Sequence, residues 1–247
     1  MAEAHFSLAA EELFKIGPLP ITNTILTTWI VTIILITFAY LATRKISPIP
    51  HGIQNVAEFA VESLSNLVES VAGDKTKVFL PIIASFFFFI LVGNYMGLLP
   101  GFGTIGFYEN IHGEKTFVPY LRSINSDLNT TLGLALISVG FTHYYAVKYL
   151  GISDYLKKWF SLNPIFLFVG IMELVGEFTK IISLSFRLFG NVFAGEVVLA
   201  TASTKLFAFI IPVPFYFLEL LVGFVQALIF AILTLAFMVI LTNKEGH

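Results

Sequence analysis

The stretch VFLPIIASFFFFILVGNYMGLLP, which runs from Val78 to Pro100, contains no charged residue. About 20 apolar residues in a row are enough to cross the ~30 Å hydrocarbon core of a bilayer as a helix. Inside that core each backbone N–H and C=O must find its partner within the protein, and a helix satisfies these groups along a single segment. The stretch therefore predicts a membrane-spanning helix over residues 79–99.

The composition of the whole chain agrees with this prediction. The 247 residues are 57% hydrophobic and 12% charged, with a mean hydropathy of +0.86. Soluble domains are about 25% charged, so the composition indicates an integral membrane protein. The net charge of -2 gives no support for a nucleic-acid partner. Because cysteine is absent, disulfides, thiolate metal sites and cysteine nucleophiles are excluded.

Other apolar runs predict further spans over residues 25–42, 128–147, 164–202 and 214–242. The segment 53–72 differs, because its apolar residues recur at helical spacing while Glu58, Glu62 and Glu69 occupy the other side. Its polar face is acidic, so we expect this helix to pack on protein rather than to be held by anionic lipid. The prediction is an all-α integral membrane protein with about five transmembrane helices plus one interfacial amphipathic helix. We expect residues 1–247 to form a single domain.

The last two predicted helices are longer than a membrane is thick. At 1.5 Å per residue they reach roughly 55 and 43 Å, whereas the hydrocarbon core measures ~30 Å. We therefore expect both helices to be strongly tilted or curved.

Basic residues near the spans predict the orientation. The richer side carries Arg44, Lys45, Lys75, Lys77, Lys148, Lys157, Lys158 and Lys244, and the other side carries Lys15, Lys115, Arg122 and Lys205. The richer side is expected to be cytoplasmic, with the N-terminus outside and the C-terminus cytoplasmic. Residues 1–15 lack the basic and apolar regions of a signal peptide. The expected location is a bacterial inner membrane, with an organellar membrane as the alternative.

One permanent charge, Arg187, lies within the run SLSFRLFGN, Ser183 to Asn191. Arginine is not deprotonated in proteins, and insertion scales put its cost at the centre of a membrane helix at roughly 2.5–3.5 kcal/mol. On a regular helix it belongs to one polar stripe. The stripe comprises Glu173, Glu177, Lys180, Arg187 and Asn191, at steps of four, three, seven and four residues.

Further acidic residues lie on the other side of Arg187. Glu196 follows it by nine residues, which rotates Glu196 by about 180° to the opposite helix face, and Glu219 and Gln226 share one face of the last helix. Two acidic clusters with a fixed cation between them suggest two half-channels, because carboxyls held in such surroundings can pass protons near neutral pH. In the alternative interpretation, ion pairs simply join the helices, with Lys180 neutralising Glu177 and Arg187 pairing with Glu196 or Glu219. Both interpretations remain open at this point.

The runs SLSFRLFGNVFAGE (residues 183–196) and ELLVGFVQALIFAIL (residues 219–233) resemble the a subunit of the F-type ATP synthase membrane sector. The resemblance covers nearly the whole chain, including GNYMGLLP and DLNTT. Some relatives of this family carry histidine at the position of Glu219. Many have proline directly after the lysine that corresponds to Lys180, where this chain has Ile181. Both departures concern details of the proton route.

The resemblance implies a non-catalytic stator subunit without a cofactor. Its partners would be a ring of c subunits, the peripheral-stalk b subunits and the soluble catalytic head. Arg187 aligns with the essential arginine, which keeps the ring carboxylate ionised and blocks a direct leak. The proton pathway would comprise Glu196, Asn191, Glu219 and Gln226 in the outer half-channel, with Glu173 and Ser183 toward the cytoplasmic exit. Both H⁺ and Na⁺ stay open as the coupling ion, because its ligands would sit on the ring subunit.

Competing functions receive less support from the sequence. A secondary transporter would require repeated halves or matched broken helices, and an intramembrane protease would require a nucleophile–base pair or H-E-x-x-H; neither pattern is visible. GFGTIG, residues 101–106, lacks the strand and helix of a dinucleotide site. We expect Asn94 to bond to a neighbouring helix and His143 to act as an interfacial anchor. Asp127 either extends the outer entrance or serves as a helix N-terminal acid.

Overall fold

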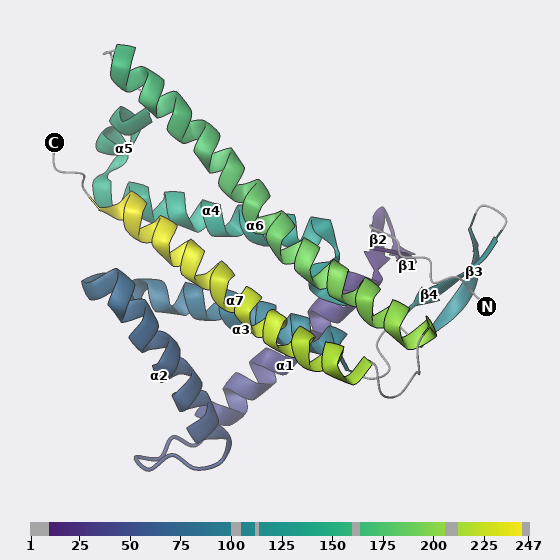
Figure 1. Cartoon of the computed structure of the whole chain (residues 1–247). Helices are drawn as coiled ribbons and strands as arrows, with labels where there is room; N and C mark the ends of the chain where they lie inside the picture. The colour runs from purple at the N-terminus through teal and green to yellow at the C-terminus, as the bar shows by residue number, and fades with distance from the viewer. Residues whose placement is uncertain (1–9, 100–104, 112–113, 160–163, 206–211, 244–247) are drawn as a thin grey trace.

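The computed structural model describes residues 10–99, 105–111, 114–159, 164–205 and 212–243. These ranges are mainly helical, which confirms the all-α membrane fold (Figure 1). The helices are α1 (Asn23–Thr43), α2 (Ile53–Ala72), α3 (Thr76–Gly97), α4 (Leu128–Leu150), α5 (Ile152–Trp159), α6 (Pro164–Lys205) and α7 (Pro212–Thr242).

The long helices occupy the ranges that the apolar runs indicate. Four helical stretches of the described chain are long and apolar enough to cross a membrane: Asn23–Thr43, Ile53–Gly97, Phe168–Leu199 and Pro212–Thr242. Helix α4 has 23 residues, enough to span, but threonines, a serine and a histidine interrupt its apolar run. Several of these polar groups bond to other helices. The Ser138 hydroxyl, for example, lies 2.8 Å from that of Thr234 on α7.

Two short hairpins and one short helix were not predicted. Strand β1 (Glu12–Ile16) pairs antiparallel with β2 (Leu19–Thr22), and β3 (Gly106–Ile111) pairs with β4 (Glu114–Pro119). Both hairpins lie at the end of the bundle where α1 begins, whereas α5 lies at the other end (Figure 1). Single-turn 3₁₀ segments, η1 (Gly73–Lys75) and η2 (Ile124–Ser126), precede α3 and α4.

Helix α5 takes its position from a glycine. Gly151 has φ 83°, a left-handed conformation that glycine adopts without steric cost. Its N–H donates to the carbonyl of Val147 at 2.9 Å, which ends α4. The chain therefore turns sharply at this point, and α5 packs against both α4 and α6.

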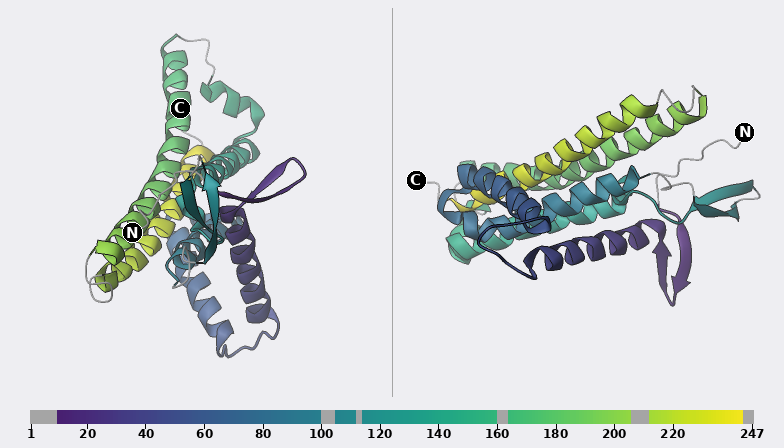
Figure 2. Two further views of the ribbon diagram at one scale, coloured as in Figure 1. Left: turned by 90° about the vertical axis from the view of Figure 1, so that its right-hand side faces the viewer. Right: turned by 90° about the horizontal axis from the view of Figure 1, so that it is seen from below.

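Helices α3 and α4 form the middle of the bundle. Helices α6 and α7 run side by side on one flank, and α1 and α2 lie on the other (Figures 1 and 2). The described chain begins near the hairpins and ends at the opposite end of the bundle, as an odd number of crossings requires. At 1.5 Å per residue, α6 and α7 are about 63 and 47 Å long, so both exceed the thickness of the hydrocarbon core.

The core is built from large side chains set against small ones. Phe79, Ile83 and Phe230 are fully buried in one cluster together with Ala227 and Ala231 of α7. In a bilayer, lipid tails are as apolar as leucine, so close packing through small residues and interhelical hydrogen bonds hold helices together. Helix α2 joins this cluster through Leu64 and Val68, which agrees with the prediction that it packs on protein.

Asn94 bonds to neighbouring segments, as its sequence position indicated. Its amide donates to the carbonyl of Gly223 on α7 at 3.0 Å, and its side-chain oxygen accepts from Asn125 at 2.7 Å. All three residues are buried. These bonds tie α3 to α7 and to the entrance of α4, beside the acidic residues described below.

Candidate functional site

Arg187 projects from α6 as an exposed cation. Its Nη2 donates to the hydroxyl of Ser183, one turn earlier, at 3.4 Å. Within the described part of the chain, no carboxylate lies at ion-pair distance from this guanidinium. The predicted alternative, in which Arg187 joins helices by pairing with Glu196 or Glu219, is therefore absent from this arrangement.

Asn191 and Gln226 connect α6 to α7 one turn beyond Arg187. The Asn191 amide donates to the Gln226 side-chain oxygen at 2.6 Å, and Gln226 is only 3% exposed. The bond places two polar groups at the helix interface between Arg187 and Glu196, which lies farther along α6.

Glu196 and Glu219, on neighbouring helices, come together beyond that bond. The Glu219 carboxyl lies directly over Gly195, at the place where the Cβ of a larger residue would stand. The adjacent Glu196 carboxyl lies beside Ser126 of η2 and within electrostatic range of Arg122 and Glu219. The structure thus gathers the predicted outer acidic residues into one cluster.

Arg122 also lies in this region, although the sequence pattern identified it only as a basic residue near the spans and not as a candidate site residue. Its Nε donates to the Ser126 hydroxyl at 3.1 Å, and the same residue's carbonyl accepts from Nη2 at 3.4 Å. Arg122 follows β4 in a polar segment, so no helical spacing links it to Glu196. Only the packing of η2 against α6 brings the two together.

A further carboxyl near Arg122 is that of Glu11, just before β1. Burial raises the pKa of Glu11, while the Arg122 charge and a hydrogen bond from Asn23 partly oppose that rise. The Asn23 amide donates to Glu11 Oε2 at 3.3 Å, and the Asn23 backbone N–H donates to the Glu11 carbonyl at 3.1 Å. The first hairpin is thereby fastened to the start of α1.

Asp127 serves as the N-cap of α4. Its carboxylate accepts from the Asn129 backbone N–H at 3.1 Å and from the Thr130 and Thr24 hydroxyls at 3.1 and 3.2 Å. An aspartate in this position accepts a hydrogen bond from a free backbone N–H at the start of the helix. Its negative charge also interacts favourably with the positive end of the helix dipole. Of the two interpretations left open, this geometry favours the helix cap.

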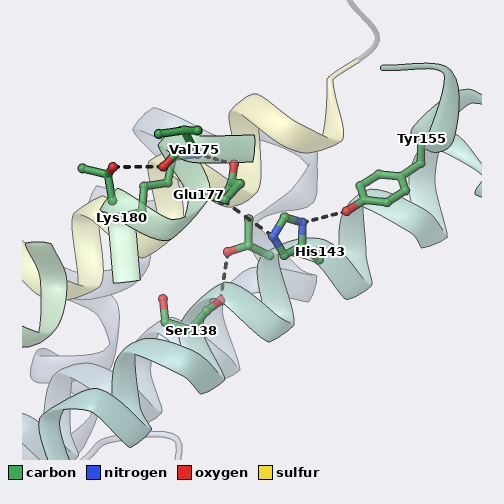
Figure 3. A network of polar contacts seen from close by, with 8 residues as sticks. Ser138, His143, Tyr155, Val175, Glu177 and Lys180 are labelled. Carbon is green, nitrogen blue, oxygen red and sulfur yellow. Dashed lines mark hydrogen bonds and ion pairs between the residues drawn. The ribbon is translucent and has the colours of Figure 1, made fainter. Parts of the chain in front are cut away.

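A second polar cluster joins α4, α5 and α6 (Figure 3), and α5 lies at the end of the bundle opposite the hairpins (Figure 1). Lys180 Nζ donates to Glu177 Oε1 at 2.6 Å, which is the ion pair predicted from their spacing. Glu177 Oε2 lies 3.6 Å from His143 Nε2, and His143 Nδ1 lies 3.0 Å from the Tyr155 hydroxyl. Glu173, one turn before Glu177, is partly buried.

His143 thus differs from its expected role as an interfacial anchor. Its side chain is 28% exposed and packs against the rings of Tyr155 and Trp159 of α5. The sequence did not predict α5, and nothing in the local pattern connects residue 143 with residue 177. The contact arises from the packing of α4, α5 and α6.

The polar residues of α6 therefore fall into three positions along one helix. Glu177 precedes Arg187 by about 15 Å and Glu196 follows it by about 14 Å, at 1.5 Å per residue. Such a series can carry protons at its two ends but not through its centre, because a guanidinium keeps its proton. No group of three or more potential metal-binding His, Asp or Glu side chains occurs among the described residues.

Comparisons with known proteins show which family the chain belongs to. Residues 25–239 match the family described as ATP synthase A chain. Three relatives are each named ATP synthase subunit a. The protein of Moorella thermoacetica is 34% identical over 96% of this chain and 97% of its own length. That of Gloeobacter violaceus is 35% identical over 91% and 85%, and that of Syntrophobacter fumaroxidans 33% over 85% and 80%. With most of its length matched by the family model and by these relatives, the chain belongs to the ATP synthase A chain family, whose members are non-catalytic membrane subunits of the F-type ATP synthase.

Proposed function

We propose that the chain is the proton-translocating stator subunit of an F-type ATP synthase, in which two half-channels separated by Arg187 couple proton flow to rotation of a c-ring. The observation that carries this proposal is the exposed guanidinium of Arg187, which has no carboxylate partner among the described residues of its own chain.

The surroundings of Arg187 support a partner outside the chain. Phe186, the residue before Arg187, and Val198, eleven residues after it on the same helix face, are both exposed, so the charge emerges beside apolar side chains. Facing lipid would cost a helix-centre arginine roughly 2.5–3.5 kcal/mol, whereas an anion on a neighbouring protein would offset that cost. A carboxylate carried past α6 on the c-ring meets this requirement.

The proposed chemistry divides between the two sides of Arg187. Glu196, Glu219, Asn191 and Gln226 form the outer half-channel, and Glu173 and Ser183 lie toward the cytoplasmic exit. A proton arriving through the outer residues neutralises a ring carboxylate, which can then turn into the lipid. On its return the carboxyl loses the proton toward the exit, and Arg187 stabilises the resulting anion by charge-assisted hydrogen bonds.

Orientation and partners follow from the same proposal. The hairpin end, which carries fewer basic residues, faces the outside, and the end with α5 and η1 faces the cytoplasm of a bacterial inner membrane. The c-ring lies against the exposed face of α6. Peripheral-stalk b subunits hold the chain still relative to the soluble catalytic head, and the chain itself binds no cofactor.

Replacing Arg187 with lysine tests the proposal, because the charge is kept and the guanidinium is lost. A lysine is a compact, strongly hydrated point charge that can release its proton when buried, so it cannot stand in for a planar, permanently charged group. We expect Arg187→Lys to abolish ATP synthesis in assembled complexes, while Arg44→Lys, a matched change after α1, leaves synthesis intact. Normal synthesis by Arg187→Lys would refute the proposed gate.

A further inference from the structure

The cluster around His143 joins three helices through groups that all can exchange protons. His143 belongs to α4, Glu177 and Lys180 to α6, and Tyr155 to α5 (Figure 3). Glu177 is 9% exposed and Lys180 is partly buried, so both charges lie largely away from water. The outer half-channel and Arg187 use none of these residues.

The two oxygens of Glu177 have different surroundings. Oε1 accepts the 2.6 Å hydrogen bond from Lys180, whose ammonium also lies 4.6 Å from the centre of the Phe237 ring on α7. Oε2 is buried and accepts no hydrogen bond from the described residues, although His143 Nε2 lies 3.6 Å away. The ion pair with Lys180 uses only Oε1 of Glu177. A purely structural ion pair therefore does not explain why Oε2 faces the His143 imidazole.

We propose that Glu177 and His143 form a proton-exchange site that links the polar stripe of α6 to the surface helix α5 through the Tyr155 hydroxyl. The inference rests on the proposed proton translocation and adds a branch to its cytoplasmic exit. Glu173 lies one turn from Glu177 on the same stripe, so a proton leaving the ring side can reach either carboxyl.

The transfer is balanced at the imidazole. A proton passes from the Glu177 carboxyl to Nε2. The Nδ1 proton passes either directly to water or to the Tyr155 oxygen while the Tyr155 hydroxyl releases its own proton to water. One proton enters, one leaves, and the ring ends neutral with its tautomer exchanged; a flip of the ring resets it. Because 3.6 Å is too long for a direct hydrogen bond, each transfer uses a bridging water or a small approach of the two side chains.

Every element around His143 contributes to its electrostatic surroundings. Helix α6 supplies Glu173, Glu177 and Lys180, α5 supplies Tyr155 and the exposed Asp154, and α4 itself supplies Lys148 at its last turn. From α7 the apolar ring of Phe237 lies against Lys180. Imidazole is the side chain whose unperturbed pKa lies between pH 5 and 8, which suits it to a proton relay.

The test uses the whole ATP synthase in sealed vesicles and measures ATP-driven proton pumping per assembled complex, as a function of pH on the α5 side. We expect His143→Gln and Glu177→Gln each to slow pumping by about three- to tenfold. This is smaller than the rate factor of about 10²–10⁴ that a general acid–base group contributes, because Glu173 offers a parallel route for the proton. A rate step between about pH 5 and 8 should disappear. The double variant should be no slower than either single one, because both residues act in one path.

Two further variants keep the result interpretable. His51→Gln changes a histidine in an exposed loop and should leave rate and pH profile unchanged. His143→Ala should regain pumping when imidazole is added, which a residue acting only as a brace would not show. A His143→Gln complex that pumps at the native rate with the native pH profile would overturn the inference, as would a loss that imidazole fails to restore. Such outcomes leave the proposed function standing as long as Arg187→Lys abolishes synthesis.

Discussion

The carboxyl group of Glu219 on α7 lies directly against Gly195 on α6, in the space that a Cβ at residue 195 would fill. This contact explains why the RLFGN stretch is followed by a glycine immediately before Glu196. Because residue 195 has no side chain, the Glu219 carboxyl from the neighbouring helix can lie beside Glu196. Glu196 and Glu219 therefore lie close together although they belong to different helices.

Gly195→Ala is therefore predicted to displace the Glu219 carboxyl. The clash involves the free end of a flexible side chain, which can rotate away, so we expect assembly and thermal stability to be preserved. Proton pumping should fall by about tenfold, in the range of a lost proton-transfer group. The matched control is Gly140→Ala on α4, where a Cβ would meet nothing within 4 Å and which lies away from α6 residues 187–196. Equal pumping by the two variants would show that the position of Glu219 is unimportant.

The carboxyls themselves provide the next prediction. Glu196→Gln and Glu219→Gln keep the size of each side chain but remove the exchangeable charge, so ATP-driven pumping should fall by about tenfold or more while assembly stays intact. Glu219→His should pump better than Glu219→Leu, because an imidazole can still relay protons. The same pumping rate in all four variants would mean that these carboxyls only join helices.

Lys75 is predicted to stabilise the end of α7. Its Nζ donates to the Thr242 carbonyl at 3.0 Å, the Thr242 hydroxyl at 3.1 Å and the Asn243 side chain at 2.8 Å, and it lies 5.1 Å from the centre of the Tyr149 ring. A cation at a helix C-terminus contributes about 0.3–1 kcal/mol, and charged hydrogen bonds somewhat more. Lys75→Met should lower the thermal midpoint of the purified subunit complex by a few degrees, whereas Lys77→Met should not.

The pH response of the first hairpin follows from Glu11. Because its folded pKa is raised above the unfolded value, the protonated form favours the docked hairpin. Docking should thus be strongest below the unfolded pKa and weaken as pH rises through the folded one. Hydrogen exchange of residues 12–22, corrected for its intrinsic pH dependence, should show this loss in the native chain and not in Glu11→Gln. An identical pH response in both would contradict the prediction.

The predicted orientation can be read directly, because the chain has no native cysteine. Tyr120 lies at the hairpin end and Asp74 at the other, and both are exposed. Single cysteines at these positions should react with a membrane-impermeant thiol reagent from opposite sides of intact cells, residue 120 from outside. Reaction of both from the same side would contradict the crossing of the membrane by α3, which separates the two positions.

The residues that the sequence identified correctly depend on local patterns. The amphipathic segment 53–72 has the same bounds in the structure as in the prediction, because helical spacing of apolar residues and flanking glycines are local features. The ion pair between Lys180 and Glu177 is likewise separated by a single helical turn. RLFGN identified Arg187 because a permanent charge in an apolar run is unusual by itself.

The residues that the sequence missed depend on how distant segments meet. Arg122 comes close to Glu196 across more than seventy residues, and His143 reaches Glu177 only because α4 and α6 pack together around α5. Neither contact leaves a periodic trace along the chain. The hairpins were also missed, since short strands joined by turns resemble the polar loops in which they occur.

The central claim is that Arg187 separates two half-channels, and passive proton flux tests it most directly. Vesicles carrying the assembled membrane sector, stripped of the soluble head, are given a proton gradient, and proton uptake is compared between native and Arg187→Ala sectors; ATP synthesis is measured in the intact complexes. The account predicts that Arg187→Ala makes no ATP and lets protons pass freely, because the fixed cation between the acidic clusters is gone. An assembled Arg187→Ala complex that makes ATP at the native rate, without a leak, would contradict it.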